Sequence, residues 1–511
     1  MTTATTPSAD QASQADAVAT GTDDAPSAGA GPERPDRFTR ALRLIRRNPG
    51  ITGLLALGVV VRLLMMVAYP PAFWFYGDSG LYVLMGKGEL VPHPTRPIGY
   101  PALLKVLEPT HTHFAVVAVQ HLLTLLLALA VYAVLVRRGV PRWIACVAAA
   151  PVIFDSLMLT LGHYLLPDVL FSVLLAGCVL VLLWSDKPGY PAVTASGLLI
   201  AAAWITKPSA LPVALLLGLY LLVRRVGWRK VVAYALGFVL PYVGMMVWIN
   251  GRPSVYGSQS ATALYGRTAI IADCDRLKLT PDERLACPDQ PLGQRWDRAD
   301  AFFWRRPARL GDIYSPEGAQ RLTDFARAVL EQQPLDYLRI VGKESAAHFV
   351  PGLYLGPMNE CLRDRMVPPT QFQDWEKVVD RCPPAQAQPN FGVNPTNPRY
   401  APKATVLTKA FHRYGEYLRT GPVVLSIGLL LSLAALFAWR RANARVRFDL
   451  LLLLAAGPGL TVLTVAVGMY EPRYALPALP LSAVAAAIAW QGLRTRRPAK
   501  TAPTEATATE S

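Results

Sequence analysis

The sequence predicts an all-α polytopic membrane protein with about ten transmembrane helices and a large extracytoplasmic loop domain. Of its 511 residues, 52% are hydrophobic and 17% are charged, whereas an average soluble chain carries roughly 25% charged residues. The charged residues are clustered, so that long uncharged runs alternate with short basic stretches. One polar segment, residues 250–420, interrupts this pattern and is long enough to form a small domain.

The elements follow in order along the chain. Residues 1–36 lack the apolar core of a signal peptide and are predicted to be a disordered cytoplasmic tail. Residues 37–249 form an N-terminal membrane core, in which 71–113 is the first loop. After the polar segment, 421–492 hold the C-terminal transmembrane helices and 493–511 form a second cytoplasmic tail. The candidate spans are 51–70, 114–136, 142–158, 167–184, 191–206, 209–223, 231–249, 421–439, 449–469 and 475–491.

The distribution of Lys and Arg predicts the topology. The net charge is +16, but much of the Lys and Arg flanks the hydrophobic spans, and a nucleic-acid partner is therefore excluded. Almost every basic cluster beside a span falls on the side of the N-terminus, as the positive-inside rule requires. We therefore expect a multi-pass protein of the cell (plasma) membrane with both termini in the cytoplasm. The pieces expected outside are 71–113, a short connection at 163–168, 250–420 and the turn 471–474.

The external segment, residues 250–420, is predicted to contain two helices and two disulfides. Apolar residues recur at helical spacing between Pro316 and Phe349, and Pro334 divides that run. Cys146 and Cys178 lie in spans as small packing residues. Four cysteines on an oxidising face allow three pairings, and zinc is a competing interpretation, although no CxxC motif is present. We expect nearest neighbours to pair: Cys274 with Cys287, and Cys361 with Cys382.

Two carboxylates are expected at the outer face of the membrane. Asp78 follows the first span, directly after the aromatic residues 74–76, and Asp168 opens the fourth span on the same side. A carboxylate at this boundary is costly, which favours a catalytic role such as that of a general base. Helix capping is the alternative for each, because Asp caps helices well. Two carboxylates at the mouths of two different helices are more informative than either alone.

Several cations are expected on the same face. Lys207, between the fifth and sixth spans, and Arg473, in the turn 471–474, lie on the side that the positive-inside rule disfavours. Each could bind a phosphate, with snorkelling to lipid headgroups as the alternative; Arg96 is a weaker candidate for that role. Arg62, inside the first span, is expected to be functional or to pair with a buried carboxylate. The candidates for assisting roles are His163, Tyr82 and Glu471.

Five short motifs are spread over most of the membrane region: Gly77-Asp78-Ser79…Tyr82, Arg96-Pro97…Gly99-Tyr100-Pro101, Leu166-Pro167-Asp168…Leu170-Phe171, Thr206-Lys207-Pro208-Ser209 and Pro472-Arg473-Tyr474…Pro477. In their order and topology they resemble the C-type (GT-C) glycosyltransferases of bacteria, in the branch similar to protein O-mannosyltransferases and lipid A aminoarabinose transferases. The resemblance implies that Asp78 is central to catalysis and that Asp168 is a second acidic residue near the site. Many relatives carry an acidic pair in the first loop, whereas Ser79 follows Asp78 here. No metal ligands and no resident cofactor are therefore predicted, with a divalent cation as the alternative.

The resemblance implies a hexosyl- or pentosyltransferase that moves a sugar from a polyprenyl-phosphate carrier to an extracytoplasmic acceptor. The implied partners are the polyprenyl-phosphate sugar donor, membrane lipid, and a cell-wall glycan, lipid or protein as acceptor. The alternative is a transporter or flippase of lipid-linked sugars, which usually shows repeats and broken helices at the bilayer midplane. A third class is a non-catalytic scaffold. Replacing Asp78 separates these classes, because only the enzyme should keep its fold and lose transfer.

Overall fold

The computed structural model describes residues 46–75, 78–252, 254–304, 306–370, 404–438 and 444–494. The helices described below belong to one compact unit within residues 48–511. Within the described ranges the chain forms helices and one isolated parallel bridge between Phe73 and Tyr164, but no strand. The predicted all-α class is confirmed. The predicted tail 1–36 and most of 493–511 lie outside the described residues.

Six helical stretches in the described part of the chain are long and apolar enough to cross a membrane. Three of them are composite: Val406–Phe437, Ala444–Val467 and Pro472–Arg494. A bent pair, which turns by 43° at a short break, would be a seventh span. The single helices are α2 (Pro49–Ala68), α5 (His113–Arg137) and α11 (Trp228–Ile249). The composite stretches contain α18 (Val406–Tyr417), α19 (Gly421–Phe437), α20 (Ala444–Leu454), α21 (Leu460–Val467) and α22 (Ala478–Arg494), and the bent pair is α6 (Arg142–Phe154) with α7 (Ser156–His163).

Three of the predicted spans form shorter apolar helices. They are α8 (Asp168–Leu183), α9 (Tyr190–Thr206) and α10 (Leu211–Val223), with 16, 17 and 13 residues. At about 1.5 Å per residue, each is shorter than a hydrocarbon core of about 30 Å. The polytopic membrane class is confirmed by the long helices, and the count of ten spans stays a prediction.

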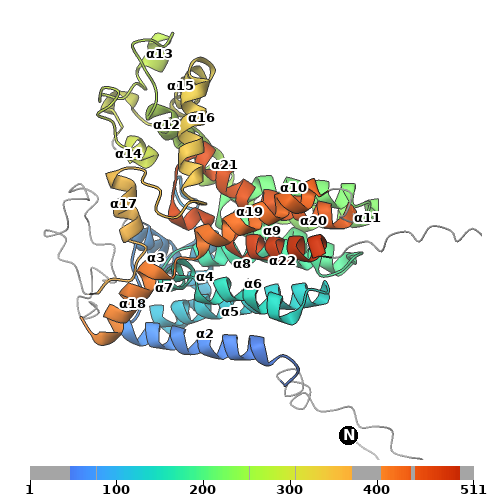
Figure 1. The fold of residues 1–511 in the computed structure, drawn as a ribbon. Helices are drawn as coiled ribbons and strands as arrows, with labels where there is room; N and C mark the ends of the chain where they lie inside the picture. Colours follow the sequence, from blue (N-terminus) through green and yellow to red (C-terminus); the bar gives the residue numbers. More distant parts are fainter. Residues whose placement is uncertain are drawn as a thin grey trace, which may run out of the picture. The chain divides into compact units, whose positions relative to one another are not determined.

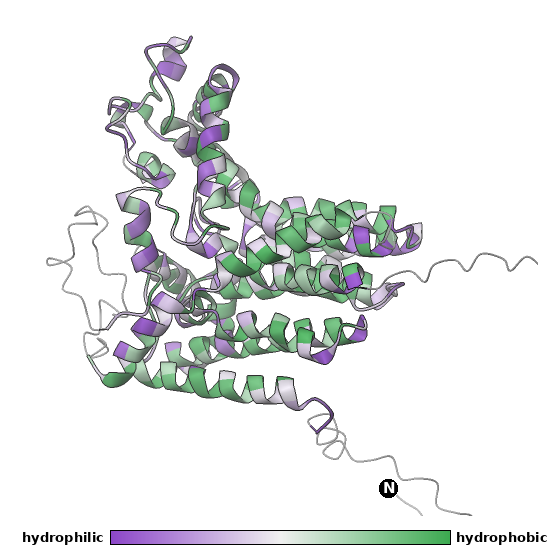
Figure 2. Ribbon diagram, in the orientation of Figure 1, coloured by the Kyte–Doolittle hydropathy of each residue, from purple (hydrophilic) through white to green (hydrophobic). Residues whose placement is uncertain are grey.

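The membrane helices contact one another through small residues. α9 packs against both α8 and α11, α5 packs against α6, and α19 packs against α22 (Figure 1). At the α9–α11 contact, a methyl group added to Gly197 would lie 2.3 Å from the carbonyl oxygen of Tyr234, so only glycine allows this approach. Close contact through small residues is typical of membrane helices. Figure 2 shows these helices apolar along most of their length, with polar residues gathered at helix ends and in the external segment.

The described part of the external segment has its own apolar cluster. Its helices are α12 (Val255–Ala269), α13 (Pro281–Arg284), α14 (Ala299–Trp304), α15 (Pro316–Gln332), α16 (Pro334–Ala346) and α17 (Pro357–Asp364). The predicted helical run is confirmed, and it breaks where Pro334 becomes the first residue of α16. The cluster joins α12, α14 and α15 through four nearly inaccessible side chains: Tyr265, Phe302, Leu322 and Phe325.

One of the two predicted disulfides can be compared with the structure. Cys274 and Cys287 are bonded, which confirms that pair. Cys382 lies outside the described residues, so the pairing of Cys361 with Cys382 stays a prediction. Cys146 and Cys178 are free thiols, as expected for packing residues within spans.

Candidate active site

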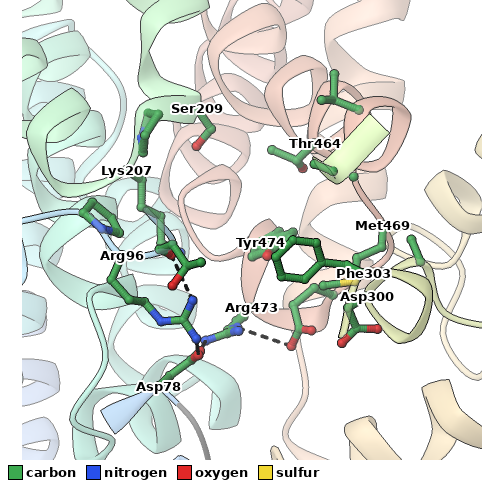
Figure 3. A pocket seen from close by; sticks show the side chains of 18 of the residues that line it. Asp78, Arg96, Lys207, Ser209, Asp300, Phe303, Thr464, Met469, Arg473 and Tyr474 are labelled. Carbon is green, nitrogen blue, oxygen red and sulfur yellow. Dashed lines mark hydrogen bonds and ion pairs between the residues drawn. The ribbon is translucent and has the colours of Figure 1, made fainter. Parts of the chain in front are cut away.

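Acidic and basic side chains from distant parts of the chain meet at one place, which we call the charged cluster. Asp78 immediately precedes α3 (Ser79–Lys87), and Arg96 lies in the loop before α4 (Gly99–Leu107). Asp168 is the first residue of α8, and Lys207 follows the last residue of α9. Glu471 and Arg473 lie at the start of the short helix η7 (Pro472–Ala475). All six residues were predicted from the sequence, and Figure 3 shows four of them converging: Asp78, Arg96, Lys207 and Arg473.

Two similar proline turns present part of this cluster. Lys207 precedes Pro208 and has φ −149° and ψ 121°, and Glu471 precedes Pro472 with φ −149° and ψ 120°. Proline disfavours the helical conformation in the residue before it and is itself suited to the first turn of a helix. Each turn therefore begins a short 3₁₀ helix, η2 (Pro208–Ala210) or η7, immediately after an extended residue.

Arg473 is at the centre of the cluster and contacts three carboxylates. Its Nη1 lies 3.0 Å from Oδ2 of Asp78 and 3.8 Å from Oδ2 of Asp168. Its Nε lies 3.3 Å from Oε1 of Glu471. Asp78 in turn accepts a short hydrogen bond from Nη2 of Arg96 through its other oxygen. Both oxygens of Asp78 are therefore engaged by guanidinium groups.

Lys207 and Asp168 form the second part of the cluster. Lys207 Nζ donates to Oδ1 of Asp168 at 2.6 Å, and it lies 5.4 Å from the ring centroid of Phe171 and 5.3 Å from that of Tyr474. Lys207 thus points into the protein and does not snorkel to lipid. The side chain of Asp78 makes no capping hydrogen bond to α3. In the structure, Asp78 and Asp168 form ion pairs and do not cap helices.

The carboxyl groups of Asp78 and Glu471 have pKa values shifted in opposite directions. Burial alone would raise the pKa of Asp78, but the positive charges of Arg96 and Arg473 outweigh it and lower that pKa from its ordinary value. Burial raises the pKa of Glu471 more than Arg473 and Arg298 lower it. The side chain of Asp78 is 16% exposed and that of Glu471 is 1% exposed. Asp78 is therefore an accessible, ionised carboxylate, and Glu471 is a buried carboxyl that protonates more readily.

The charged cluster forms one wall of a large cavity of about 1220 Å³. A second wall is apolar and comes from membrane helices: Phe171, Leu211, Leu460, Leu463 and Val467. A third wall comes from the external segment, where α14 contributes aromatic and charged side chains and α17 contributes Met358, Cys361 and Leu362. The cavity thus offers fixed charges beside an apolar surface, which suits a ligand with an anionic head and a hydrocarbon chain.

The structure adds two charged residues that the sequence interpretation missed. Arg298 is 5% exposed, and it contacts Asp300 Oδ1 at 3.0 Å and Glu471 Oε2 at 3.1 Å. Both Arg298 and Asp300 line the cavity. In the sequence they are two charges in a polar stretch without periodicity, which carries no signal that separates them from solvated surface residues. The buried turn at Glu471 brings them into the site.

Of the remaining candidates from the sequence, Tyr82 lies at the cavity, whereas His163 and Arg62 do not line it. His163 is buried, donates from Nε2 to the carbonyl oxygen of Tyr69 at 2.6 Å and lies beside His121, and it is not among the residues that line the cavity. Arg62 is bonded to Thr124 and to a backbone carbonyl of its own helix, and the described residues offer it no carboxylate.

A divalent cation does not fit the charged cluster as it stands. Both oxygens of Asp78 contact guanidinium groups, and Asp168 is held by Lys207. A metal ion placed against either carboxylate would sit beside two or three fixed positive charges. Among the described residues, no group of three or more His, Cys, Asp or Glu side chains is arranged to hold a metal ion.

No family model matches the sequence and no curated protein matches it. Solved structures that align with it include the oligosaccharyltransferase AglB of Archaeoglobus fulgidus in complex with an inhibitory peptide and a dolichol-phosphate (TM-score 0.40, 11% identity, 89% of this chain and 51% of that one). ArnT of Cupriavidus metallidurans in the apo state aligns with a TM-score of 0.34 and 14% identity, over 86% of this chain and 77% of that one. The apo oligosaccharyltransferase of Archaeoglobus fulgidus aligns with a TM-score of 0.35 and 10% identity, over 86% of this chain and 50% of that one.

The chain spans about half the length of the two oligosaccharyltransferase chains. All three TM-scores are below 0.5, so the likeness is distant, and the function proposed below is argued from the residues of this chain.

Proposed function

We propose that this protein is an integral membrane glycosyltransferase that transfers a hexose or pentose from a polyprenyl-phosphate carrier to an extracytoplasmic acceptor. The observation that carries the proposal is the convergence of Asp78, Lys207 and Arg473 on a cavity whose neighbouring wall is apolar. A polyprenyl-phosphate sugar has an anionic phosphodiester between a hydrocarbon chain and a sugar. The cations match the phosphodiester, and the apolar wall matches the hydrocarbon chain.

In this proposal the donor phosphate binds to Lys207 and Arg473, with Arg96 in support. These cations are 18%, 11% and 13% exposed as side chains, so they are accessible from the cavity while largely removed from bulk water. Positive charge held in such a setting stabilises a leaving phosphate strongly, because it does not have to reorganise during the reaction. Asp168 keeps Lys207 in place from behind, since it is 1% exposed and is not among the lining residues.

Asp78 is the residue proposed to face the acceptor. The acceptor hydroxyl oxygen bonds to the anomeric carbon, the bond from that carbon to the phosphate oxygen breaks, polyprenyl phosphate leaves, and the hydroxyl proton passes to water. The lowered pKa of Asp78 makes its carboxylate a weak base that is ionised throughout the neutral range. It therefore suits orientation of the hydroxyl and stabilisation of developing positive charge on the sugar. It also holds Arg96 and Arg473 in position.

The proposed setting is the cell (plasma) membrane, with both termini cytoplasmic and the charged cluster at the outer face. The one-sided distribution of Lys and Arg beside the spans supports this orientation. The proposed parts are the membrane core 37–249, the external segment 250–420 and the helices of 421–492. The acceptor is a cell-wall glycan, a lipid or a protein.

The experiment is transfer by the purified full-length protein in lipid nanodiscs, supplied with a panel of labelled polyprenyl-phosphate sugars and a membrane extract as acceptor. We expect release of polyprenyl phosphate and labelling of one acceptor fraction by the parent protein, and neither by Asp78→Asn. A transporter would instead move labelled lipid across liposomes without releasing polyprenyl phosphate, and that outcome would contradict the proposal.

A further inference from the structure

One cation on the cavity wall differs from the others because it forms no ion pair with a described carboxylate. Of the Lys and Arg side chains that line the cavity, Arg96, Lys207, Arg298 and Arg473 each form an ion pair with a carboxylate. Arg365 also lines the cavity, but its guanidinium makes no hydrogen bond or ion pair with any described residue, and its Nη2 is buried without a partner.

The orphan state of Arg365 is costly. A buried donor without a partner has lost its hydrogen bonds to water and gained none in return, and the cost is larger when the donor is charged. Burial lowers the pKa of Arg365 to about 10, and the nearby positive charge of Arg298 adds to the shift. At neutral pH the group is still a cation. A cation in this situation would be stabilised most by an anion that enters the cavity.

Arg365 lies on the wall formed by the external segment. It directly follows α17, and Met358, Cys361 and Leu362 of that helix line the cavity with it, as expected for one helical face. The charged side chains that act on it most are Arg298, Glu471 and Asp300, and not Lys207 or Arg96. It therefore lies on the side of the cavity formed by α14 and α17, where Arg298 and Asp300 are its charged neighbours.

We propose that Arg365 is the anion-binding residue of an acceptor subsite, and that the acceptor carries a phosphate or carboxylate group near its accepting hydroxyl. This inference rests on the proposed function. The donor brings one phosphodiester, for which Lys207 and Arg473 already provide charge. The acceptor is the second substrate, and the external segment, which is predicted to lie outside the membrane, supplies the wall that carries Arg365. A planar guanidinium forms paired hydrogen bonds with phosphate or carboxylate oxygens, which fixes the orientation of the bound group.

Arg298 is the neighbour that makes this subsite selective for one anion. Its own charge is compensated by Asp300 and Glu471, and its Nη1 reaches the side-chain oxygen of Asn359 on α17 at 3.5 Å. Arg298 is paired with two carboxylates and held in place. On this wall, the positive charge left for a ligand to neutralise is therefore that of Arg365. A single monoanionic group would neutralise that charge. A ligand with several negative charges would be repelled by the two carboxylates already on the wall, Asp300 and Glu471.

The test uses full-length protein in nanodiscs with two probes, farnesyl phosphate for the donor site and inorganic phosphate for the acceptor subsite. Calorimetric titration at constant ionic strength should show inorganic phosphate binding while farnesyl phosphate is saturating. Arg365→Gln should weaken inorganic phosphate binding by about tenfold or more and should leave farnesyl phosphate affinity within about twofold. Lys207→Gln should show the reverse pattern.

The matched control is Arg339→Gln, which removes one positive charge from an 80% exposed side chain of α16. It should change neither affinity, and an equal loss in this control would attribute the effect to net charge and overturn the subsite. Competition between the two probes would overturn it as well, because Arg365 would then bind the donor phosphate. If Arg365→Gln does not fold, Arg365→Lys, which keeps the charge, is used in its place. If Arg365→Gln folds and binds inorganic phosphate as tightly as the parent protein, the proposal is refuted.

The parent protein alone gives an answer that does not depend on any variant. If it binds no inorganic phosphate at millimolar concentrations in the presence of farnesyl phosphate, the subsite does not exist. Failure of the proposed function would look different: farnesyl phosphate would bind equally well to the parent and to Lys207→Gln and Arg473→Gln, whatever happened at Arg365.

Discussion

Arg267 of α12 and Glu344 of α16 form a buried ion pair that also holds the backbone leading to the charged cluster. Arg267 donates from Nη1 and Nη2 to the two carboxylate oxygens of Glu344 at 2.8 and 2.6 Å. Arg267 Nε donates to the carbonyl oxygen of Gly468 at 2.9 Å, and Glu344 accepts from the backbone N–H of Tyr470 at 2.7 Å. The external segment thereby fixes residues 468–470, which directly precede Glu471 and Arg473.

Breaking this pair should reduce stability and transfer together. Arg267→Met leaves Glu344 as a buried charge without its partner, at a cost of about 3–5 kcal/mol. The double replacement Arg267→Met with Glu344→Met leaves no unpaired charge and should be less destabilising than either single change. Melting temperatures of the four proteins in nanodiscs form a double-mutant cycle. Additive losses would show that the two residues do not act as a pair.

Asp78→Asn should abolish most of the transfer activity while the protein remains folded. The change keeps the size of the side chain and removes the charge that orients Arg96, Arg473 and the acceptor. We expect a loss of about 10²–10³ in turnover, as for removal of one preorganised electrostatic contact. The matched control is Asp282→Asn, because Asp282 is 61% exposed and forms an ion pair with Arg321 on the external segment, away from the cavity. Near-parental turnover in Asp78→Asn would leave the carboxylate without a catalytic role.

Lys207→Gln and Arg473→Gln should each weaken binding of a polyprenyl phosphate. Loss of one charge-assisted hydrogen bond corresponds to about tenfold in affinity. Lys105→Gln is the matched control, since Lys105 is a 43% exposed lysine of α4 that pairs with Glu108, the residue directly after that helix. Binding is measured by titration with farnesyl phosphate at fixed ionic strength. If the double variant binds as tightly as the parent, these cations do not contact the carrier.

The rate of transfer should fall in acid as Glu471, and not Asp78, takes up a proton. The pKa of Glu471 is raised above 4.5, whereas that of Asp78 is lowered below 3.8. As the pH falls, Glu471 is therefore neutralised first, and Arg298 and Arg473 lose a counter-charge while Asp78 is still ionised. Rate profiles should show this acid limb in the parent and not in Glu471→Gln, whose rate should be low and flat. A parental profile that is constant down to pH 4.5 would contradict this assignment.

The external segment and the C-terminus should lie on opposite sides of the membrane. Leu292 is 54% exposed in the external segment, so Leu292→Cys gives an accessible thiol there, and Ser511→Cys reports on the C-terminus. An impermeant maleimide applied to intact cells should label the first variant and not the second, with the parent protein as the background. Labelling of both from outside would rule out the proposed topology.

The sequence was sufficient for the helices and for most of the charged cluster, and the reasons are local. Asp78, Asp168, Lys207 and Arg473 each adjoin a hydrophobic run, and charge at such a boundary is visible without a structure. Arg298 and Arg365 could not be found in this way, because they lie in a polar stretch and acquire meaning only from the cavity. The helices α8, α9 and α10 were predicted with nearly the observed bounds, but hydropathy alone does not establish that helices this short each cross the membrane.

The proline turns at Lys207-Pro208 and Glu471-Pro472 bear on the entropy of carrier binding. A proline and the residue before it have few backbone conformations even in a disordered chain. The loss of backbone freedom that would otherwise accompany capture of a phosphate is therefore already small for the two turns that present Lys207 and Arg473. Replacing Pro208 or Pro472 would add flexibility without removing a charge, and its cost would appear as weaker binding with a larger entropic penalty.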